Sequence, residues 1–504
     1  MALSRLRSWR GWEAVALLGI LALSLGLRLW ELGAQNLWLD ELFTVSITSA
    51  GPAHAVAGTA ADTNPPLYYV LQSLVSPWLG RSEYAMRLLP AATSVLATLV
   101  IYAIGKKAFG GAVGLWAALL FAVLPRSIEY AQEARMYSLL MLLTAVAILA
   151  FVMLVEKPGW IRATLFGVSL AAVAYSHVYG YMVAAAFALP VLALPRVRRA
   201  VGRYSLASFC VAIVLFLPWT LMISRQVHSV LASASKGTWW GEPVDEVVTQ
   251  SVSRLMWLVP STNVILSLLF AGLFALGLPF SMKVAPRQPG EREVANGVQE
   301  NDIVWTLLAV GILPVVFGVT VSKYVTMVAT NRNTLVALPA ACLLIARGAS
   351  RFRRPVTVLL LGICVVWSIA VLPGYYRSTS KGQWRTITTD ALSATPNHAV
   401  VAETYVNALQ LATYADVLGG SKGLHLMWTD SSFSDAHAPN IAGWQSSYDT
   451  KLSSYLTGLN QLVVVSETGD PGPAEKYMRG LAGWAEKSRY FDGGVVVHVW
   501  TRKP

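Results

Sequence analysis

The chain has 504 residues, of which 55% are hydrophobic and 13% are charged, about half the charged fraction of soluble domains. With a mean hydropathy of +0.53, this composition excludes an ordinary soluble protein and indicates a polytopic membrane protein. The formal net charge of +12 does not indicate a nucleic-acid partner, because the basic residues cluster in short loops between apolar segments.

Eleven apolar segments are candidate membrane-spanning helices. They lie near residues 12–30, 84–104, 112–126, 135–155, 161–176, 179–195, 204–222, 262–282, 302–321, 332–347 and 355–373. Several are shorter than the roughly 20 residues that a simple span requires. Residues 161–195 are compatible with two short helices broken at His177–Gly180 or with one long kinked helix.

The basic residues predict the orientation of these spans. They gather at the N-terminus and in the loops 106–107, 157–162, 196–203, 283–292 and 347–354. Because positively charged loops stay in the cytoplasm, the opposite side receives 31–83, 127–134, 223–261, 322–331 and everything after about 374. We therefore expect a multi-pass plasma (inner) membrane protein, in contact with membrane lipids.

Residues 374–504 differ in character from the rest of the chain. Apolar runs of strand length occur at 398–402, 423–427, 461–465 and 494–499, and helical patterns separate them near 404–417, 449–458 and 473–486. Strands alternating with helices indicate a small α/β domain. We expect a membrane domain over 1–373, whose first outer loop (31–83) holds short surface helices, and a soluble extracytoplasmic α/β domain over 374–504.

Asp40 and Glu41 follow directly after the first apolar segment. Carboxylates at a membrane edge are energetically costly and are therefore functional candidates. Two adjacent carboxylates raise each other's pKa or gather a cation, which suits a general base with a supporting acid. The alternative is that these acids belong to a surface loop or cap the following helix.

A turn of sequence Asn64-Pro65-Pro66-Leu67-Tyr68 follows the acidic pair. In order and placement, the two motifs resemble those of the GT-C glycosyltransferases. The closer similarity is to the branch of the protein O-mannosyltransferases and the lipid A aminoarabinose transferase, and it covers roughly residues 10–350. The resemblance implies a GT-C membrane fold, with Asp40 as catalytic base and Glu41 in support.

A polar cluster follows the third predicted span and is expected on the same side as Asp40. Gln132, Glu133, Arg135 and Tyr137 resemble the cluster at this place in the family, which implies a phosphate contact for Arg135 and substrate contacts for Glu133 and Tyr137. The alternative is a charge pair of Glu129 with Glu133 at a helix start.

His177 lies among tyrosines, including Tyr179, near a helix end on the Asp40 side. Sugar-binding sites favour this combination, so we predict substrate contacts for His177 and Tyr179. A structural histidine whose ring is satisfied within the fold is the alternative, and a metal-binding role is less favoured.

Lys323 and Arg332 flank a short outward loop, against the charge bias of that side. Fixed positive charges there would clamp a phosphate at the membrane surface, with Tyr324 contacting the substrate. The alternative is that both side chains are interfacial anchors. The family more often has Pro-Arg-Tyr where this chain has Asn331-Arg332-Asn333, so Arg332 departs from the pattern.

The resemblance implies an inverting glycosyltransferase that moves a sugar from a polyprenyl-phosphate donor to an acceptor hydroxyl of a lipid, glycan or protein. No nucleotide-sugar motif occurs on the cytoplasmic side, which favours a lipid-linked donor. One alternative is a transporter or flippase of a lipid-linked sugar, which would place polar residues near the midplane of the membrane. Another is a membrane-anchored binding protein whose α/β domain acts. Assistance by a divalent cation stays open.

Overall fold

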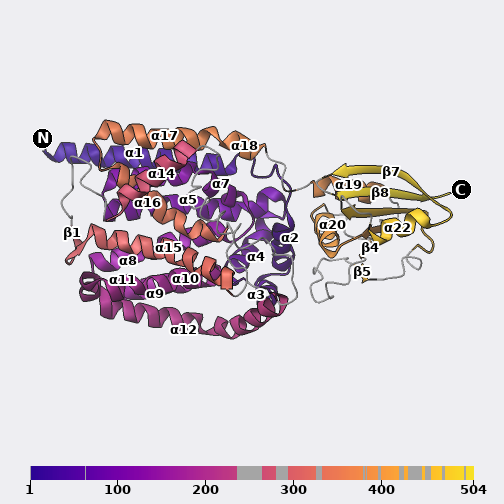
Figure 1. Cartoon of the computed structure of the whole chain (residues 1–504), viewed down its shortest axis with the longest axis horizontal. Coiled ribbons are helices and arrows are strands. Elements are labelled where there is room, and N and C mark those ends of the chain that lie inside the picture. The colour runs from indigo at the N-terminus through magenta and orange to yellow at the C-terminus, as the bar shows by residue number, and fades with distance from the viewer. Residues whose placement is uncertain are drawn as a thin grey trace. The chain divides into compact units, whose positions relative to one another are not determined.

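The computed structural model of the chain describes residues 2–62, 64–234, 264–279, 293–324, 332–377, 381, 383–394, 399–418, 425–428, 445–448, 456–467, 472–492 and 495–503 (Figure 1). Backbone contacts divide the chain into two compact units. The first, the helical unit, comprises residues 1–30, 59–68 and 88–376. The second, the mixed unit, comprises residues 31–58, 69–87 and 377–504. The mixed unit thus joins most of the predicted first outer loop to the C-terminal part of the chain.

The helical unit consists of apolar helices, because only internal hydrogen bonds satisfy the backbone in lipid. Its longer helices are α1 (Ala2–Leu29), α5 (Glu83–Ala108), α6 (Gly111–Val123), α8 (Tyr137–Glu156), α9 (Trp160–Ser176), α12 (Pro195–Ala234), α14 (Val264–Gly277), α15 (Glu300–Tyr324), α16 (Leu338–Ala349) and α17 (Arg354–Ala370). Shorter elements are α7 (Pro125–Glu129), η1 (Tyr130–Gln132), α10 (Val178–Ala186), α11 (Ala188–Ala193), β1 (Glu293–Ala295), β2 (Val298–Gln299), η2 (Asn333–Ala337) and α18 (Leu372–Tyr376).

Each of the predicted apolar segments corresponds to a helix. Among the described residues, six helices are long and apolar enough to cross a membrane, and the bent pair Gly111–Val123 and Pro125–Gln132 makes up to seven. The remaining segments are shorter apolar helices at Trp160–Ser176, Val178–Ala193, Leu266–Gly277 and Asn333–Ala349. The polytopic helical architecture is confirmed, while the number of eleven spans stays a prediction. The helix is interrupted at His177, which separates α9 from α10, so 161–195 is not one continuous helix.

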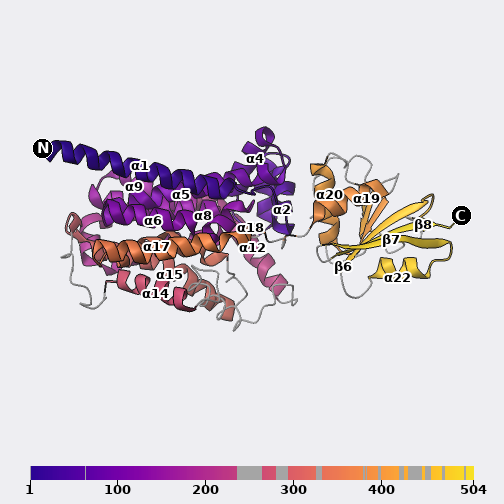
Figure 2. The same cartoon turned by 90° about the horizontal axis from the view of Figure 1, so that it is seen from above.

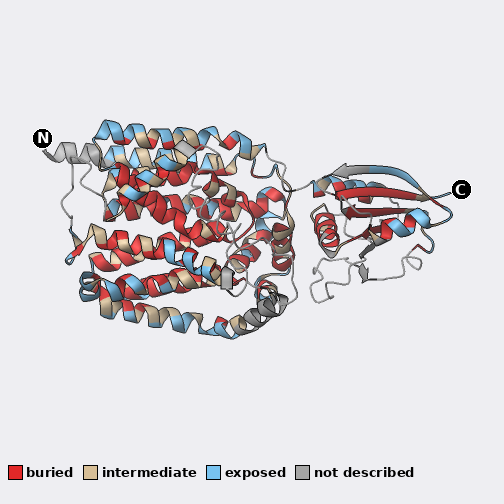
Figure 3. Cartoon of the chain, viewed as in Figure 1, coloured by how far each residue is buried: buried red, intermediate tan, exposed pale blue. Residues whose placement is uncertain are grey.

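Helix α8 lies in the interior of the helical unit, whereas α1, α12 and α17 expose much of their apolar surface, as lipid-facing helices do (Figure 3). Helix α9 packs along α8 and α12, and α16 packs on α6 and α14. Helices α5 and α6 cross at two glycines, where a Cβ on Gly105 would lie 2.6 Å from the Cα of Gly114. Small residues at such a crossing allow membrane helices to approach closely.

The predicted third span bends by 62° where α6 meets α7. Arg28, fully buried in α1, donates hydrogen bonds to the carbonyls of Phe121 and Ala122 at the end of α6 and to the hydroxyls of Ser94 and Ser127. These bonds satisfy carbonyl groups that a helix end leaves without partners. Arg28 therefore stabilises the bend that leads the chain into the polar segment 127–135.

Helix α12 continues beyond the predicted span to Ala234, while its apolar candidate span ends at Ile223. The segment from residue 223 therefore begins as helix, and its position on the outer side stays a prediction. Residues 235–263, which contain most of the predicted loop, lie outside the described residues.

The short helices predicted in the first outer loop are present as α2 (Leu39–Thr48), α3 (Pro52–Ala61) and α4 (Leu67–Leu79), while their location at the membrane surface stays a prediction. The C-terminal part contributes α19 (Trp384–Ala394), α20 (Tyr405–Val417) and α22 (Pro473–Gly480). Within the mixed unit, α20 packs on both α19 and α2. The first outer loop is therefore held against C-terminal helices and not only by its own neighbours in sequence.

The C-terminal part forms a six-stranded sheet with strand order β5-β4-β3-β6-β8-β7. The strands are β3 (Ala399–Ala402), β4 (His425–Trp428), β5 (Gln445–Tyr448), β6 (Gln461–Glu467), β7 (Trp484–Asp492) and β8 (Val495–Arg502). The pairs among β5, β4, β3 and β6 are parallel, and β8 pairs antiparallel with β6 and β7. Figure 2 shows α19 and α20 on one face of the sheet and α22 on the other.

The predicted small α/β domain is confirmed, with corrections. All four predicted strands are present, but β5 and β7 were not predicted. The helix expected over 473–486 ends at Gly480, and Gly483, with φ +88°, leads into β7. Strand β7 escaped prediction because it is an edge strand with largely exposed, polar residues and so lacks a regular apolar alternation. The helix expected over 449–458 lies mostly outside the described residues.

Candidate active site

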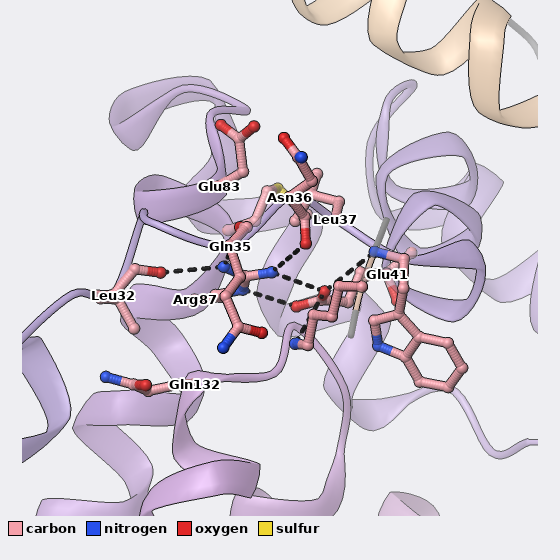
Figure 4. A network of polar contacts seen from close by, with 12 residues as sticks. Leu32, Gln35, Asn36, Leu37, Glu41, Glu83, Arg87 and Gln132 are labelled. Carbon is pink, nitrogen blue, oxygen red and sulfur yellow. Dashed lines mark hydrogen bonds and ion pairs between the residues drawn. The ribbon is translucent and has the colours of Figure 1, made fainter. Parts of the chain in front are cut away.

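Arg87, near the start of α5, is the centre of a buried network in the mixed unit (Figure 4). Its Nε and Nη2 atoms each donate to the carboxylate of Glu41 over 2.8 Å. The remaining N–H groups donate to the carbonyls of Leu32, Gln35 and Asn36 over 2.7–3.0 Å. All five guanidinium donors are therefore engaged, and Arg87 fixes the segment that leads into the acidic pair.

Glu41 is fully buried and carries two positively charged neighbours. Besides Arg87, the Nζ of Lys381 donates to Oε2 over 3.2 Å, and the backbone N–H of Trp38 donates to the same atom over 3.3 Å. The last contact satisfies a backbone donor at the start of α2, as the acidic residue of a capping box does. The alternative that one of the acids is the N-cap of this helix is not borne out, because the N-cap position is Trp38 and Glu41 is the third residue of α2.

Asp40 lies in the first turn of α2, next to Glu41 but in a different environment. Successive residues of a helix are about 100° apart around its axis, so the two side chains leave the helix in different directions. Glu41 is buried, whereas Asp40 is half-buried. The two acids therefore differ in burial and in the direction in which they leave the helix.

A second set of contacts ties the C-terminal helices to the same loop. Arg385 in α19 forms a bidentate ion pair with Glu83 over 2.6 and 3.0 Å. The hydroxyl of Tyr414 in α20 accepts the backbone N–H of Leu37 and donates to Glu83. Burial and the charge of Glu83 raise the pKa of Tyr414, so the hydroxyl stays protonated. The hydrogen bond to Glu83 raises the pKa of Arg385, which keeps its charge.

Sequence reasoning did not find Arg87, Lys381, Glu83, Arg385 or Tyr414. A signal was present for one of them, because Arg87 lies inside a predicted apolar span. A charged residue there is a functional or structural candidate by default. The other four carry no comparable signal, since charged residues and a tyrosine outside spans are ordinary.

Three of the predicted substrate residues, Tyr137, His177 and Tyr179, lie close together in the helical unit. The ring of Tyr137 lies 5.7 Å from that of His177, which in turn lies 6.0 Å from that of Tyr179. Nδ1 of His177 accepts the backbone N–H of Tyr179 and so caps α10. The Tyr179 hydroxyl hydrogen-bonds the side chain of Asn333, which directly follows Arg332. The structure thus brings the predicted aromatic residues close to the Arg332 turn.

The polar segment after the bent span is buried in the helical unit. Glu133 and Arg135 are both buried, and Arg135 lies close enough to His177 for an electrostatic interaction between the two side chains. Gln132 donates to the carbonyls of Arg28 and Trp30, so its side chain caps the end of α1. Arg135 therefore lies near the aromatic cluster, while Gln132 has a structural role.

Two further predictions concern a charge pair of Glu129 and the residues at the end of α15. Glu129 ends α7 and pairs with Arg126 over 2.8 Å, and α8 has no acidic residue in its first turn, so the alternative of two acids at a helix start is not borne out. Lys323 and Tyr324 end α15, and their side chains lie outside the described part of the chain.

Asp40 and Glu41 belong to the mixed unit, and the other predicted site residues belong to the helical unit. Within the described residues, no group of three or more His, Cys, Asp or Glu could hold a metal.

Comparison with known proteins gives one family and several structures. Residues 63–222 match the model of the family described as Dolichyl-phosphate-mannose-protein mannosyltransferase. The chain is similar to the apo crystal structure of ArnT from Cupriavidus metallidurans, with 13% identity, a TM-score of 0.50 and 98% of each chain covered. The undecaprenyl phosphate complex of ArnT gives 12% identity, a TM-score of 0.48 and the same coverage.

A further solved structure with a similar arrangement is the oligosaccharyltransferase of Archaeoglobus fulgidus in complex with Zn and sulfate. It gives 13% identity and a TM-score of 0.49, and the match covers 89% of this chain and 67% of that chain. The sequence matches none of the curated proteins with which it was compared.

The fold is the GT-C fold of membrane glycosyltransferases, as the motifs at Asp40 and Asn64 predicted. The family match over 63–222 falls on the bent span, the polar segment and the His177 break. The chain therefore has the polytopic fold of these membrane proteins with a small C-terminal sheet domain, and its residues 63–222 are similar to a mannosyltransferase family.

Proposed function

We propose that the protein transfers a sugar, with inversion, from a polyprenyl-phosphate donor to an acceptor hydroxyl at the extracytoplasmic face of the membrane. The name of the matching family, which includes a dolichyl phosphate linked to mannose, supports a lipid-linked donor. The observation that carries the proposal is the difference in burial between the two acids. Glu41 is neutralised by Arg87 and Lys381, whereas Asp40 stays half-buried at the start of α2.

Asp40 is the proposed catalytic base. The acceptor oxygen attacks the anomeric carbon while Asp40 takes its proton, and the bond from that carbon to the phosphate oxygen breaks on the opposite face. Polyprenyl phosphate leaves with the bonding electrons, and the new glycosidic bond has inverted configuration. Glu41 supports this step by fixing the first turn of α2 and not by exchanging protons, because two cations hold its charge.

Positive charge must meet the departing phosphate, where negative charge develops. We assign this role to Lys323, Arg332 and Arg135. The substrate contacts are assigned to Glu133, Tyr137, His177, Tyr179 and Tyr324. The hydrogen bond of Tyr179 with Asn333 and the electrostatic interaction of Arg135 with His177 support a common location for these groups in the helical unit.

The proposed sidedness follows from the loop charges. The bias of Lys and Arg puts the N-terminus in the cytoplasm, and the first outer loop and residues after about 374 outside. In this arrangement the membrane domain is 1–373 and the soluble domain is 374–504. The acceptor is a lipid, glycan or protein that reaches the outer surface of the plasma (inner) membrane.

The direct test is transfer by the purified protein in lipid nanodiscs. Radiolabelled polyprenyl-phosphate sugars of several kinds are supplied in turn with lipid, glycan and peptide acceptors, and the anomeric configuration of any product is determined. We expect one donor to give labelled product of inverted configuration, and Asp40→Asn to abolish it. Movement of intact donor between leaflets without any transfer would instead support the flippase alternative.

A further inference from the structure

Residues from the C-terminal part of the mixed unit hold the chain on both sides of Asp40. Lys381 contacts Glu41, one residue after Asp40, and Tyr414 contacts the backbone N–H of Leu37, three residues before it. Both contacts join segments that are more than 300 residues apart in sequence, with separations of 340 and 377.

We propose that Lys381 and Tyr414 are positioning residues, through which the C-terminal domain fixes the first turn of α2 and the Asp40 carboxylate. The inference rests on the proposed function, in which Asp40 is the base. It gives the C-terminal domain a role in the transfer step without a contact of its own to the donor.

Lys381 is not needed to neutralise Glu41, because Arg87 already forms a bidentate pair with that carboxylate. The three side chains together carry a net charge of one positive unit. The Lys381 side chain is 18% exposed, so its ammonium group stays near solvent, which lowers the cost of the second charge. What Lys381 adds is a connection between the segment after the last apolar helix and the start of α2.

Tyr414 acts at the other side of Asp40 through one hydroxyl with two partners. The hydroxyl accepts from Leu37 and donates to Glu83, so it requires both a protonated tyrosine and a fixed carboxylate. Glu83 is itself held by Arg385, and Arg81 pairs with Asp416, two residues after Tyr414. Helices α19 and α20 are thus bound to Arg81 and Glu83, just before and at the start of α5, and these contacts hold Tyr414 in place.

Loss of either contact should act on turnover more than on donor affinity. A general base must lie within hydrogen-bond reach of the proton that it takes, and a misplacement of about 1 Å can lower the rate by roughly 10²-fold. The donor phosphate contacts proposed above belong to the helical unit, whereas Lys381 and Tyr414 belong to the mixed unit. The expected signature is a fall in kcat with little change in the KM for donor.

The test compares Lys381→Met, Tyr414→Phe and the conservative Lys381→Arg in the full-length protein. Lys476→Met is the matched control, because Lys476 is an exposed lysine of the same domain on α22. For each protein, kcat and the donor KM are measured, together with amide hydrogen exchange over residues 37–48.

We expect kcat to fall about 10- to 100-fold in Lys381→Met and Tyr414→Phe, with donor KM within about twofold. Hydrogen exchange over 37–48 should become faster in both, and Lys381→Arg should recover most of the activity. Exchange and kcat like those of Lys476→Met in both variants would overturn the inference. If the wild-type protein transfers no sugar at all, the proposed function fails, and the exchange data still decide whether these residues hold α2.

Discussion

Arg87 and Glu41 form a bidentate ion pair, with both N–O distances at 2.8 Å, in which neither side chain is more than 1% exposed. Removing one partner of such a pair leaves a buried charge without compensation and typically costs about 3–5 kcal/mol. Arg87→Met should therefore lower the thermal unfolding temperature and the yield of folded protein in detergent.

The lysine variant makes this prediction specific. A lysine keeps the positive charge at residue 87 but offers one ammonium group in place of the planar fork. It cannot serve Glu41 together with the carbonyls of Leu32, Gln35 and Asn36, so Arg87→Lys should be nearly as unstable as Arg87→Met. Full stability of Arg87→Lys would show that charge alone is required.

The catalytic assignment predicts that Asp40→Asn lowers turnover by about 10²–10⁴-fold, the usual contribution of a positioned base. Donor binding should survive, because Asp40 contacts the acceptor and not the phosphate. Single-turnover kinetics on the folded variant measures both. If Asp40 only stabilises the start of α2, the variant would lose about 1 kcal/mol of stability and transfer sugar at a near-normal rate.

The proposed phosphate clamp predicts a defect in donor use. Charge-assisted hydrogen bonds contribute roughly 1.5–3 kcal/mol each, so Lys323→Ala and Arg332→Ala should each weaken use of the donor by about tenfold or more. Titration of the donor at saturating acceptor gives the KM and kcat of each variant. Arg353→Ala, at an exposed residue before α17, is the control, and unchanged kinetics in both test variants would reject the clamp.

The topology predicts opposite sides for residues 290 and 420. Single cysteines at Gly290 and Gly420, in a background without Cys210, Cys342 and Cys364, can be labelled in sealed inverted and right-side-out vesicles. We expect an impermeant maleimide to reach position 420 only from the outside and position 290 only from the cytoplasmic side. Labelling of both positions from one side would rule out the proposed location of the active site.

Glu475 in α22 predicts a pH dependence for the C-terminal sheet domain. Burial raises its pKa. The hydrogen bond from Arg479, the electrostatic interaction with His498 and the hydrogen bond from Ser466 together lower the pKa by more than burial raises it, so the net shift is downward. A carboxyl group with a lowered folded-state pKa stabilises the fold above its unfolded-state pKa, about 4.3, and loses this effect as pH falls through the folded-state value.

The corresponding variant is Glu475→Gln, compared with the exposed Lys476→Gln. We expect a lower unfolding temperature than wild type at pH 7 in tryptophan fluorescence, because Trp500 stacks on His498 in the same cluster. The difference should disappear below about pH 4, where the wild-type carboxyl group becomes protonated. A difference that is equally large at pH 3 and pH 7 would contradict the charge-based explanation.

The sequence by itself determined the membrane helices and the main strands of the sheet. Apolar segments such as 137–156 become helices because lipid offers no hydrogen-bond partner to the backbone, so each segment must satisfy its own N–H and C=O groups. Strands β3, β6 and β8 were also predictable, because short apolar runs bounded by turns are a local signal. The motif at Asp40 and Asn64 led to the GT-C fold in the same way, through residues close in sequence.

Only the tertiary structure decided the environment of the acidic pair. As a sequence, Asp40 and Glu41 are equivalent neighbours, and the fold makes them different because it buries Glu41 in ion pairs with Arg87 and Lys381 and leaves Asp40 half-buried. These partners come from positions 46 and 340 residues away, where no periodicity or local motif relates them to α2. The environment of a carboxylate depends on which distant charges the fold brings to it, since electrostatic interactions decay with distance in space and not along the chain.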